Sequence, residues 1–289
     1  MGWIAVGFSV AITCFWAFWG ANETFHEGWY YETFMKNMGL AIIQYLSPML
    51  IFMGVGIISI YWPRVGGVIH IVVALLAAWF FNILTNAVVI FIIMPLVGIG
   101  ILYWYGSPPS RKIATRWMIG LPVLVTLVAG IVPAYRVSQR ISERNLGAQL
   151  VHGNGITLMW APSGPGWPRE GANWYEAERV CQLLNQDGKT VASEPQNIWR
   201  LPTADEAVRS MALHGENSRG VWDSTNAKAE YEKRPDKEFP LWDIYSQIVY
   251  WWTATEADQE NAYIVVYDGK VWTRAKQLNM GNLGFRCVK

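Results

Sequence analysis

The chain has 289 residues and a formal net charge of +1, from 23 basic and 22 acidic side chains. Only 16% of its residues are charged, 52% are hydrophobic and 17 are tryptophan, whereas about a quarter of an ordinary soluble domain is charged. This composition excludes a disordered chain, a collagen-like repeat and a small disulfide-dense protein, and it disfavours a single soluble domain. The near-neutral charge gives no argument for nucleic acid as a partner.

The charges divide the chain into two halves of different character. Residues 1–144 hold 8 basic and 4 acidic side chains, and residues 145–289 hold the remaining 15 basic and 18 acidic ones. Since a membrane-spanning helix needs about 20 apolar residues, the long charge-free stretches predict a multi-span membrane domain over residues 1–136. Five α-helices are expected, near residues 3–20, 40–62, 66–82, 86–105 and 117–135. The polar turn Asn82–Asn86 separates the third helix from the fourth. The third is short, so a re-entrant segment is its alternative.

Basic residues in the short loops predict the orientation in the membrane. Arg64 follows the second helix, and Arg111, Lys112 and Arg116 lie between the fourth and the fifth. Because short cytoplasmic loops are enriched in Lys and Arg, we expect a multi-pass protein of the cytoplasmic (plasma) membrane. Its N-terminus would lie on the inner side of the membrane and its C-terminal half on the outer side. Three arginines that would then lie outside count against this topology: Arg136, Arg140 and Arg144.

One polar cluster follows the first helix. Glu23, His26 and Glu27 are spaced i, i+3 and i+4, which places them on one helical face. Carboxylates and imidazole together suit Zn, Mn or Fe, so these residues are a candidate metal site. The alternative is a solvated polar face at the end of the helix.

Residues 137–154 are polar and are expected to link the membrane domain to a globular domain over residues 155–289. Two helices are predicted there, from Asn173 to Leu184 and from Thr203 to about Leu213, because each begins with a capping-box-like pattern.

Strand patterns follow after Tyr250. Asp268-Gly269 between two β-rich stretches predicts a hairpin turn, and residues 284–288 predict a final strand. Between the helices and these strands lies a long polar stretch, residues 215–247. Long irregular loops often carry function, so its aromatic residues are candidate binding anchors: Trp222, Tyr231 and Trp242.

The chain has three cysteines. Cys14 lies inside the first helix, where a small buried hydrophobe is expected. Cys181 and Cys287 belong to the C-terminal half. If that half lies outside, the oxidising compartment favours a disulfide between them; two free buried thiols are the alternative.

Four sequence blocks, in this order, resemble the Lcl C-terminal (DUF1566) domain and the related formylglycine-generating-enzyme (sulfatase-modifying-factor) superfamily. They are Asn173-Trp-Tyr-Glu-Ala-Glu-Arg-Val-Cys181, Trp199-Arg-Leu-Pro-Thr203 with Glu206, Tyr250-Trp-Trp-Thr-Ala-Thr255, and Gly284-Phe-Arg-Cys-Val288. The resemblance covers about residues 155–289. It implies an α+β C-type-lectin-like fold and the disulfide between Cys181 and Cys287.

The enzymatic members of that superfamily oxidise a substrate cysteine with copper held by two cysteines before the final strand. Residues 256–282 of this chain contain no cysteine, so the resemblance implies the fold and not the catalytic residues. No cofactor is expected, although calcium in the lectin-like domain is an alternative. Hard cations prefer oxygen ligands, which the loop carboxylates could supply: Asp223, Asp236 and Asp243.

The leading functional hypothesis is a membrane-anchored binding protein that displays a non-catalytic lectin-like domain outside the cytoplasmic membrane. Its partners would be membrane lipid and either a protein or an envelope glycan. The second hypothesis is an accessory subunit of a larger membrane complex, because Gly54, Gly56, Gly98 and Gly100 permit close helix packing. The third is an enzyme, metal-dependent at Glu23, His26 and Glu27 or thiol-dependent at the two C-terminal cysteines.

Overall fold

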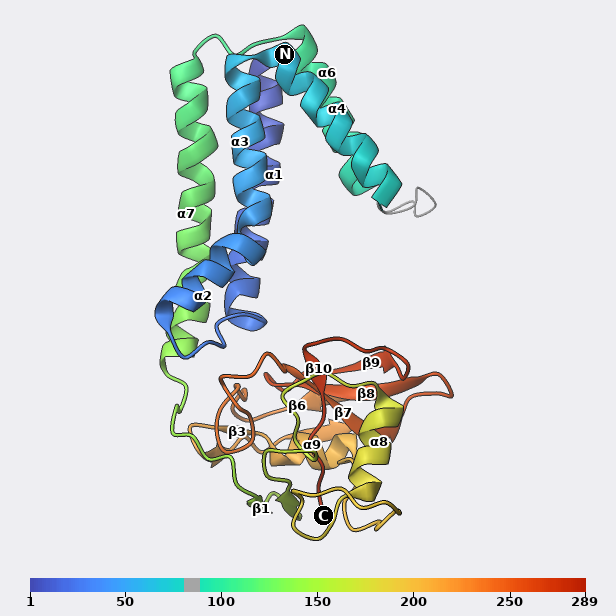
Figure 1. Cartoon of the computed structure of the whole chain (residues 1–289). Coiled ribbons are helices and arrows are strands. Elements are labelled where there is room, and N and C mark those ends of the chain that lie inside the picture. The colour runs from blue at the N-terminus through green and yellow to red at the C-terminus, as the bar shows by residue number, and fades with distance from the viewer. Residues whose placement is uncertain (81–88) are drawn as a thin grey trace. The chain divides into compact units, whose positions relative to one another are not determined.

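The computed structural model describes residues 1–80 and 89–289, and it divides into two compact units. The helical unit contains residues 1–29 and 34–135, and the C-terminal unit contains residues 30–33 and 136–289 (Figure 1).

The helical unit contains six described α-helices and two short π-helical turns. In chain order they are α1 (Gly2–His26), α2 (Phe34–Leu40), η1 (Ala41–Tyr45), α3 (Ser47–Tyr61), α4 (Pro63–Phe80), η2 (Val89–Ile93), α6 (Met94–Tyr105) and α7 (Arg111–Ser138). The expected polar turn Asn82–Asn86 lies outside the described residues.

Two of these helices, α1 and α7, are long and apolar enough to cross a membrane. A third crossing is added if α2 with η1 and α3 count as one span, although the chain bends by 57° between them. Apolar helices α4 and α6 are shorter. Apolar helices therefore occur among residues 1–80 and 89–136, as the sequence predicts. The structure supports two or three full-length membrane spans, and five spans stay a proposal.

Close packing in this unit depends on two of the four expected glycines. A Cβ atom on Gly100 of α6 would lie 2.8 Å from the carbonyl oxygen of Gly67 in α4, and the reverse distance is 2.7 Å. Gly56 of α3 similarly lies against the Met118 side chain of α7. Gly54 and Gly98 face open space, so the interhelical role expected of them is not seen among residues 1–80 and 89–289.

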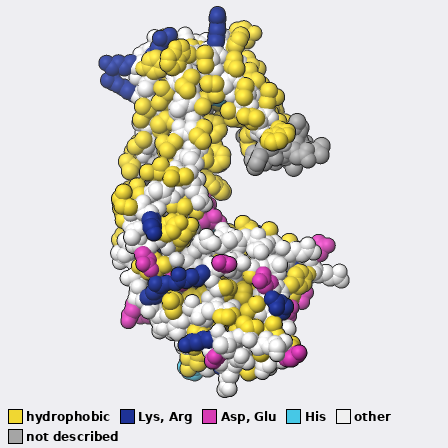
Figure 2. Space-filling model, in the orientation of Figure 1, with side chains coloured by type: hydrophobic (Ala, Val, Ile, Leu, Met, Phe, Trp, Pro, Cys, Tyr) yellow, Lys and Arg dark blue, Asp and Glu magenta, His cyan; other side chains and the backbone are white. Residues whose placement is uncertain are grey.

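One end of the helical unit is basic. Gly2, at the start of α1, lies against the backbone of Ser107, just after α6. The guanidinium of Arg111 lies 6.0 Å from the ring of Tyr61, at the end of α3. Figure 2 shows Lys and Arg side chains gathered at this end. The N-terminus and Arg111, at the start of α7, therefore share one end.

The C-terminal unit is an α+β fold built around a curled four-stranded sheet in the order β10-β7-β8-β9 (Figure 1). Its strands are β7 (Tyr250–Glu256), β8 (Asn261–Val266), β9 (Val271–Ala275) and β10 (Leu283–Gly284). β10 pairs in parallel with β7, and the other neighbours are antiparallel. The expected hairpin at Asp268-Gly269 is confirmed, and Gly269 supplies the positive φ of +86° that the turn needs.

Three two-stranded ribbons complete the unit: β1 (Gln149–Gly153) with β2 (Ile156–Trp160), β3 (Ala212–Leu213) with β4 (Glu216–Asn217), and β5 (Val221–Asp223) with β6 (Lys228–Glu230). β1 lies within residues 137–154, which were expected to form a linker. The sheet strand expected at 284–288 is shorter, because Val288 instead bridges Trp160 and Arg200.

Both expected helix starts are confirmed by their caps. In α8 (Trp174–Leu183) the Asn173 side chain accepts a hydrogen bond from the Glu176 N–H at 2.9 Å. In α9 (Ala204–Ser210) Thr203 and Glu206 form a reciprocal capping box. The second helix ends before Leu213, because the chain turns extended after Ser210 and enters the β3–β4 hairpin.

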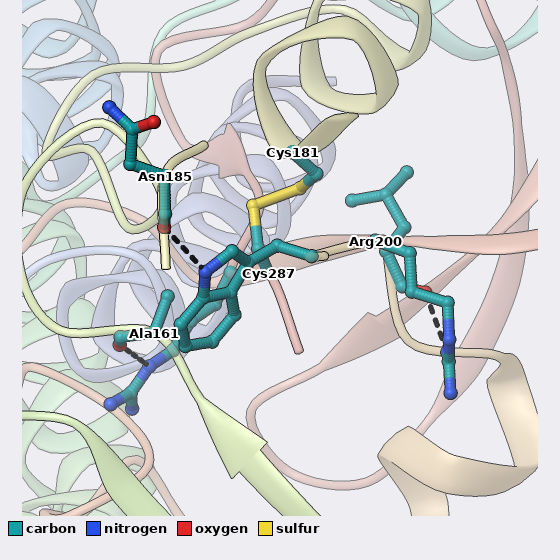
Figure 3. The surroundings of a disulfide bond; sticks show 8 residues. Ala161, Cys181, Asn185, Arg200 and Cys287 are labelled. Atoms are coloured by element: carbon teal, nitrogen blue, oxygen red, sulfur yellow. Dashed lines mark hydrogen bonds between the residues drawn. A yellow bond between two sulfur atoms is a disulfide. The ribbon is translucent and has the colours of Figure 1, made fainter. Parts of the chain in front are cut away.

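Tryptophan dominates the core of this unit. Trp160, Trp199, Trp251 and Trp252 are almost completely buried. The disulfide between Cys181 of α8 and Cys287 crosses the same core (Figure 3). This bond confirms the expected pairing, and the two free thiols that were its alternative are not present in the structure.

A fully buried arginine joins separate segments of this core. The Arg286 guanidinium donates to the carbonyl oxygens of Ala161 at 2.8 Å and of Leu241 at 2.7 Å. Its Cζ atom lies over the ring of Trp167, 3.6 Å from the ring centroid. Because guanidinium offers five donors in a fixed plane, one side chain ties the C-terminal segment to two distant parts of the chain.

Candidate binding groove

A shallow groove runs along the free edge of the four-stranded sheet. Its volume is about 540 Å³, and it is lined by Ala227, Tyr263, Val271, Trp272, Thr273 and Arg274. β9 ends the strand order, so its outer edge pairs with no strand among the described residues. Ala227 belongs to the turn between β5 and β6. The groove therefore lies between an unpaired strand edge and a neighbouring hairpin turn.

The sheet register positions the groove residues. Tyr263 of β8 lies directly opposite Thr273 of β9, so their side chains share one face of the sheet. The ring of Trp222, from β5, packs edge-on against the ring of Tyr263 with centroids 5.4 Å apart. This contact joins the β5–β6 hairpin to the sheet beside the groove.

The hairpin turn is itself well ordered by hydrogen bonds. The Asp223 carboxylate accepts from the backbone N–H groups of Thr225 at 2.9 Å and Asn226 at 3.2 Å. A hydrogen bond from the Asn226 side chain, followed by these two backbone bonds, holds the pKa of Asp223 below its ordinary value. Ala227 follows with a positive φ of 50°, so the turn fixes the position of this lining residue.

The groove carries positive charge. The guanidinium of Arg274 lies 5.3 Å from the ring centroid of Trp272, and the Lys270 ammonium lies 5.9 Å from it. Lys270 is paired with Asp268 at 3.2 Å. Arg274 forms no ion pair with any described carboxylate; its Nη1 donates instead to the carbonyl oxygen of Thr273 at 3.0 Å. Arg274 is therefore available to an anionic ligand.

The three aromatic residues expected as binding anchors lie in different surroundings. Trp222 is half-buried and supports the groove through Tyr263. The hydroxyl of Tyr231 donates to the carbonyl oxygen of Gly269 at 2.9 Å, beneath the β8–β9 turn. Trp242 is only 2% exposed, so its expected place on the surface is wrong: its ring is part of the core.

The loop that carries Trp242 is held by a cluster of buried charges. Arg140 donates two hydrogen bonds to the Asp236 carboxylate, at 2.8 and 3.1 Å. Lys237 is fully buried and donates to the carbonyl oxygen of Ser246. Burial, followed by the nearby positive charge of Arg140, lowers the pKa of Lys237 to about 7.

A buried carboxylate extends this cluster. Glu238 accepts a hydrogen bond from the backbone N–H of His214 at 2.6 Å, and burial raises the pKa of Glu238. Perturbed groups of this kind occur at functional sites and in structural ion networks. Here Lys237 and Glu238 are both buried, so the cluster orders the loop and presents no surface to a ligand.

The carboxylates considered for metal binding are not brought together. Asp236 pairs with Arg140, and Asp243 lies 3.8 Å from Arg169, while Asp223 holds its own turn. Among residues 1–80 and 89–289, no group of three or more His, Cys, Asp or Glu side chains could hold a metal ion. Glu23, His26 and Glu27 are among these residues, so the structure does not bring them together as the expected metal site.

Most groove residues do not stand out in the sequence, because a strand edge becomes a site only when the strand order is known. The one local feature that points to it is Trp272 with a cation two residues away on each side.

No family model matches the chain, and no curated protein matches it in sequence.

Proposed function

We propose that this protein is a membrane-anchored recognition protein, and that its C-terminal unit binds a partner outside the cytoplasmic membrane. The groove at the edge of β9 carries the proposal, since it combines an open surface with Arg274, an arginine that forms no ion pair with any carboxylate among the described residues. The chain that bears this groove also contains two helices that could span a membrane.

The proposed orientation places the N-terminus in the cytoplasm. It is supported by the basic end of the helical unit, to which the N-terminus and the residues near Arg111 belong, because cytoplasmic loops are enriched in Lys and Arg. The disulfide between Cys181 and Cys287 also fits an oxidising compartment. In this proposal all five expected helices lie in the bilayer, with α4 and α6 as a short packed pair.

We assign the C-terminal unit a lectin-like fold of the type seen in the Lcl C-terminal and formylglycine-generating-enzyme group. Support comes from the four sequence blocks, which form α8, the start of α9, β7 and the C-terminal segment. The role proposed for the unit is binding without catalysis.

Site-specific photo-cross-linking tests this function. A benzoylphenylalanine placed at Ala227 in the groove should give a discrete covalent adduct in intact cells. The matched control places the same probe at Val191, which is exposed in a different part of the unit. Equal labelling at both sites, or no adduct at Ala227, would overturn the proposal. An adduct recovered at fixed stoichiometry with a membrane protein would identify the chain as an accessory subunit.

A further inference from the structure

We infer that the groove takes an extended acidic peptide segment of a partner protein, which adds to the free edge of β9 as a further strand. The inference rests on the binding function proposed above and names its ligand class. Proteins commonly recognise extended peptides by strand addition at an exposed sheet edge, where main-chain hydrogen bonds supply affinity.

The register shows which backbone groups of β9 are available. Val266 donates to the carbonyl oxygen of Lys270 at 2.8 Å, so these two residues form a hydrogen-bonded pair. Pairs alternate between hydrogen-bonded and non-hydrogen-bonded along an antiparallel ladder. Val271 and Thr273 therefore occupy non-hydrogen-bonded positions opposite β8, and their backbone groups point away from the sheet.

The other side of β8 agrees with this assignment. The carbonyl oxygen of Tyr263, the partner of Thr273 in the register, accepts a hydrogen bond from the Thr253 side chain of β7 at 2.8 Å. It therefore points away from β9. The N–H and C=O of Val271 and the N–H of Thr273 are left at the open edge, spaced as one extended strand requires.

The remaining outward carbonyl, that of Thr273, is capped by the Arg274 guanidinium at 3.0 Å. Charged side chains commonly protect exposed strand edges in this way. An acidic side chain on an incoming peptide would form an ion pair with Arg274 and draw it off the carbonyl. The freed carbonyl oxygen of Thr273 would then accept a hydrogen bond from a backbone N–H of the peptide. The edge would therefore bind an acidic peptide in preference to a neutral or basic one.

The aromatic residues favour a peptide over a glycan. Sugar rings stack on open aromatic faces, but Trp272 already has Lys270, Arg274 and the Tyr250 ring around it, all within 6 Å. Tyr263 is contacted by the edge-on ring of Trp222. The small side chain of Ala227 and the exposed Thr273 instead leave room for alternate side chains of an extended chain.

The test is a calorimetric titration of the full chain, in detergent micelles, with the synthetic peptide Glu-Val-Glu-Val-Glu, acetylated at its N-terminus and amidated at its C-terminus. The titration measures the affinity of the peptide for the chain. Thr273→Pro removes the outward N–H of β9 and should weaken peptide binding at least about tenfold, because one main-chain hydrogen bond to the peptide is lost. The variant should still fold, because edge strands accept proline. Thr273→Val keeps that N–H and should bind like the wild type. Arg274→Glu should also weaken binding at least about tenfold by charge reversal.

Two further probes keep the result decisive if Thr273→Pro unfolds. The same peptide with its central glutamate and the following valine both N-methylated, and a Lys-Val-Lys-Val-Lys peptide, should both fail to bind the wild-type chain. Equal binding of the N-methylated peptide would overturn strand addition. So would binding of a hexuronate oligosaccharide at the groove while the acidic peptide does not bind.

Failure of this inference is distinguishable from failure of the proposed function. A cross-link at Ala227 to a glycan would keep the binding function and overturn the peptide. Absence of any adduct at Ala227 would overturn the binding function itself.

Discussion

Trp242 lies face to face with Trp251 of β7, with ring centroids 3.5 Å apart and ring planes 3° apart. Trp160 packs on the same Trp251 ring at 5.2 Å. The stack fastens the long polar stretch, which shows no periodicity in the sequence, onto the central strand of the sheet. A residue that resembles a loop anchor in the sequence is therefore a core residue in the fold.

Replacing Trp242 should unfold the C-terminal unit more readily. Trp242→Ala empties a core position and should cost about 3–5 kcal/mol, the usual range for a large aromatic residue. Trp222→Ala, at a half-buried position, should cost about 1 kcal/mol. Chemical unfolding of the full chain in detergent, followed by tryptophan fluorescence, measures both. Similar costs for the two variants would contradict the burial of Trp242.

The stability of the C-terminal unit should rise with pH above neutrality because of Lys237. Its pKa is about 7 when folded, against an ordinary value of 10.5. Between these values the unfolded chain binds a proton that the folded chain does not, so raising the pH favours folding. Below pH 7 both states are protonated and this dependence disappears.

We expect the free energy of unfolding to increase by up to about 1.4 kcal/mol per pH unit between pH 7.5 and 9.5. The charged groups that act on Lys237 are Arg140, Asp243 and Asp236. Lys237→Met serves as the control, since it removes the titrating group and should flatten the slope. An unchanged slope in that variant would assign the pH dependence to another residue.

Arg286→Lys should destabilise the unit although the charge is retained. Lysine cannot reproduce the planar set of donors to Ala161 and Leu241 or the stacking on Trp167. Leaving buried carbonyl groups without donors should cost about 2–4 kcal/mol. The same substitution at the exposed Arg179 of α8 is the matched control, with an expected effect within about 0.5 kcal/mol.

In the helical unit, Gly100→Leu should separate α4 from α6. Any Cβ atom there would lie 2.8 Å from the Gly67 carbonyl oxygen, which forces the two backbones apart at a cost of about 1–3 kcal/mol. Gly98→Leu, on the same helix and facing open space, should be tolerated. SDS titration of the purified chain compares the two. Equal sensitivity would show that the close contact does not hold the pair together.

Thiol labelling tests the proposed orientation. A membrane-impermeant maleimide should label Ser224→Cys in intact cells, whereas Lys112→Cys should react only after permeabilisation. Cys181 and Cys287 should react only after reduction and denaturation, since they are joined by a disulfide. Labelling of Lys112→Cys without permeabilisation would invert the topology.

Local chemistry explains what could be predicted from the sequence. The caps at Asn173 and Thr203 and the turn at Asp268-Gly269 are set by neighbouring residues, because capping and tight turns depend on bonds within a few positions. The apolar stretches that become α1 and α7 are likewise a property of composition. The pairing of Cys181 with Cys287 followed from the number of cysteines, their proposed compartment and the family resemblance.

The tertiary structure alone decided which surface is open. Burial of Trp242 depends on its stacking against Trp251 of β7. Whether α2, η1 and α3 form one span depends on the 57° bend between them. The groove exists because β9 pairs with β8 on one side only. Local sequence determines how a segment folds, but exposure of an edge or a ring is set by what packs against it, and those contacts join residues far apart in the chain.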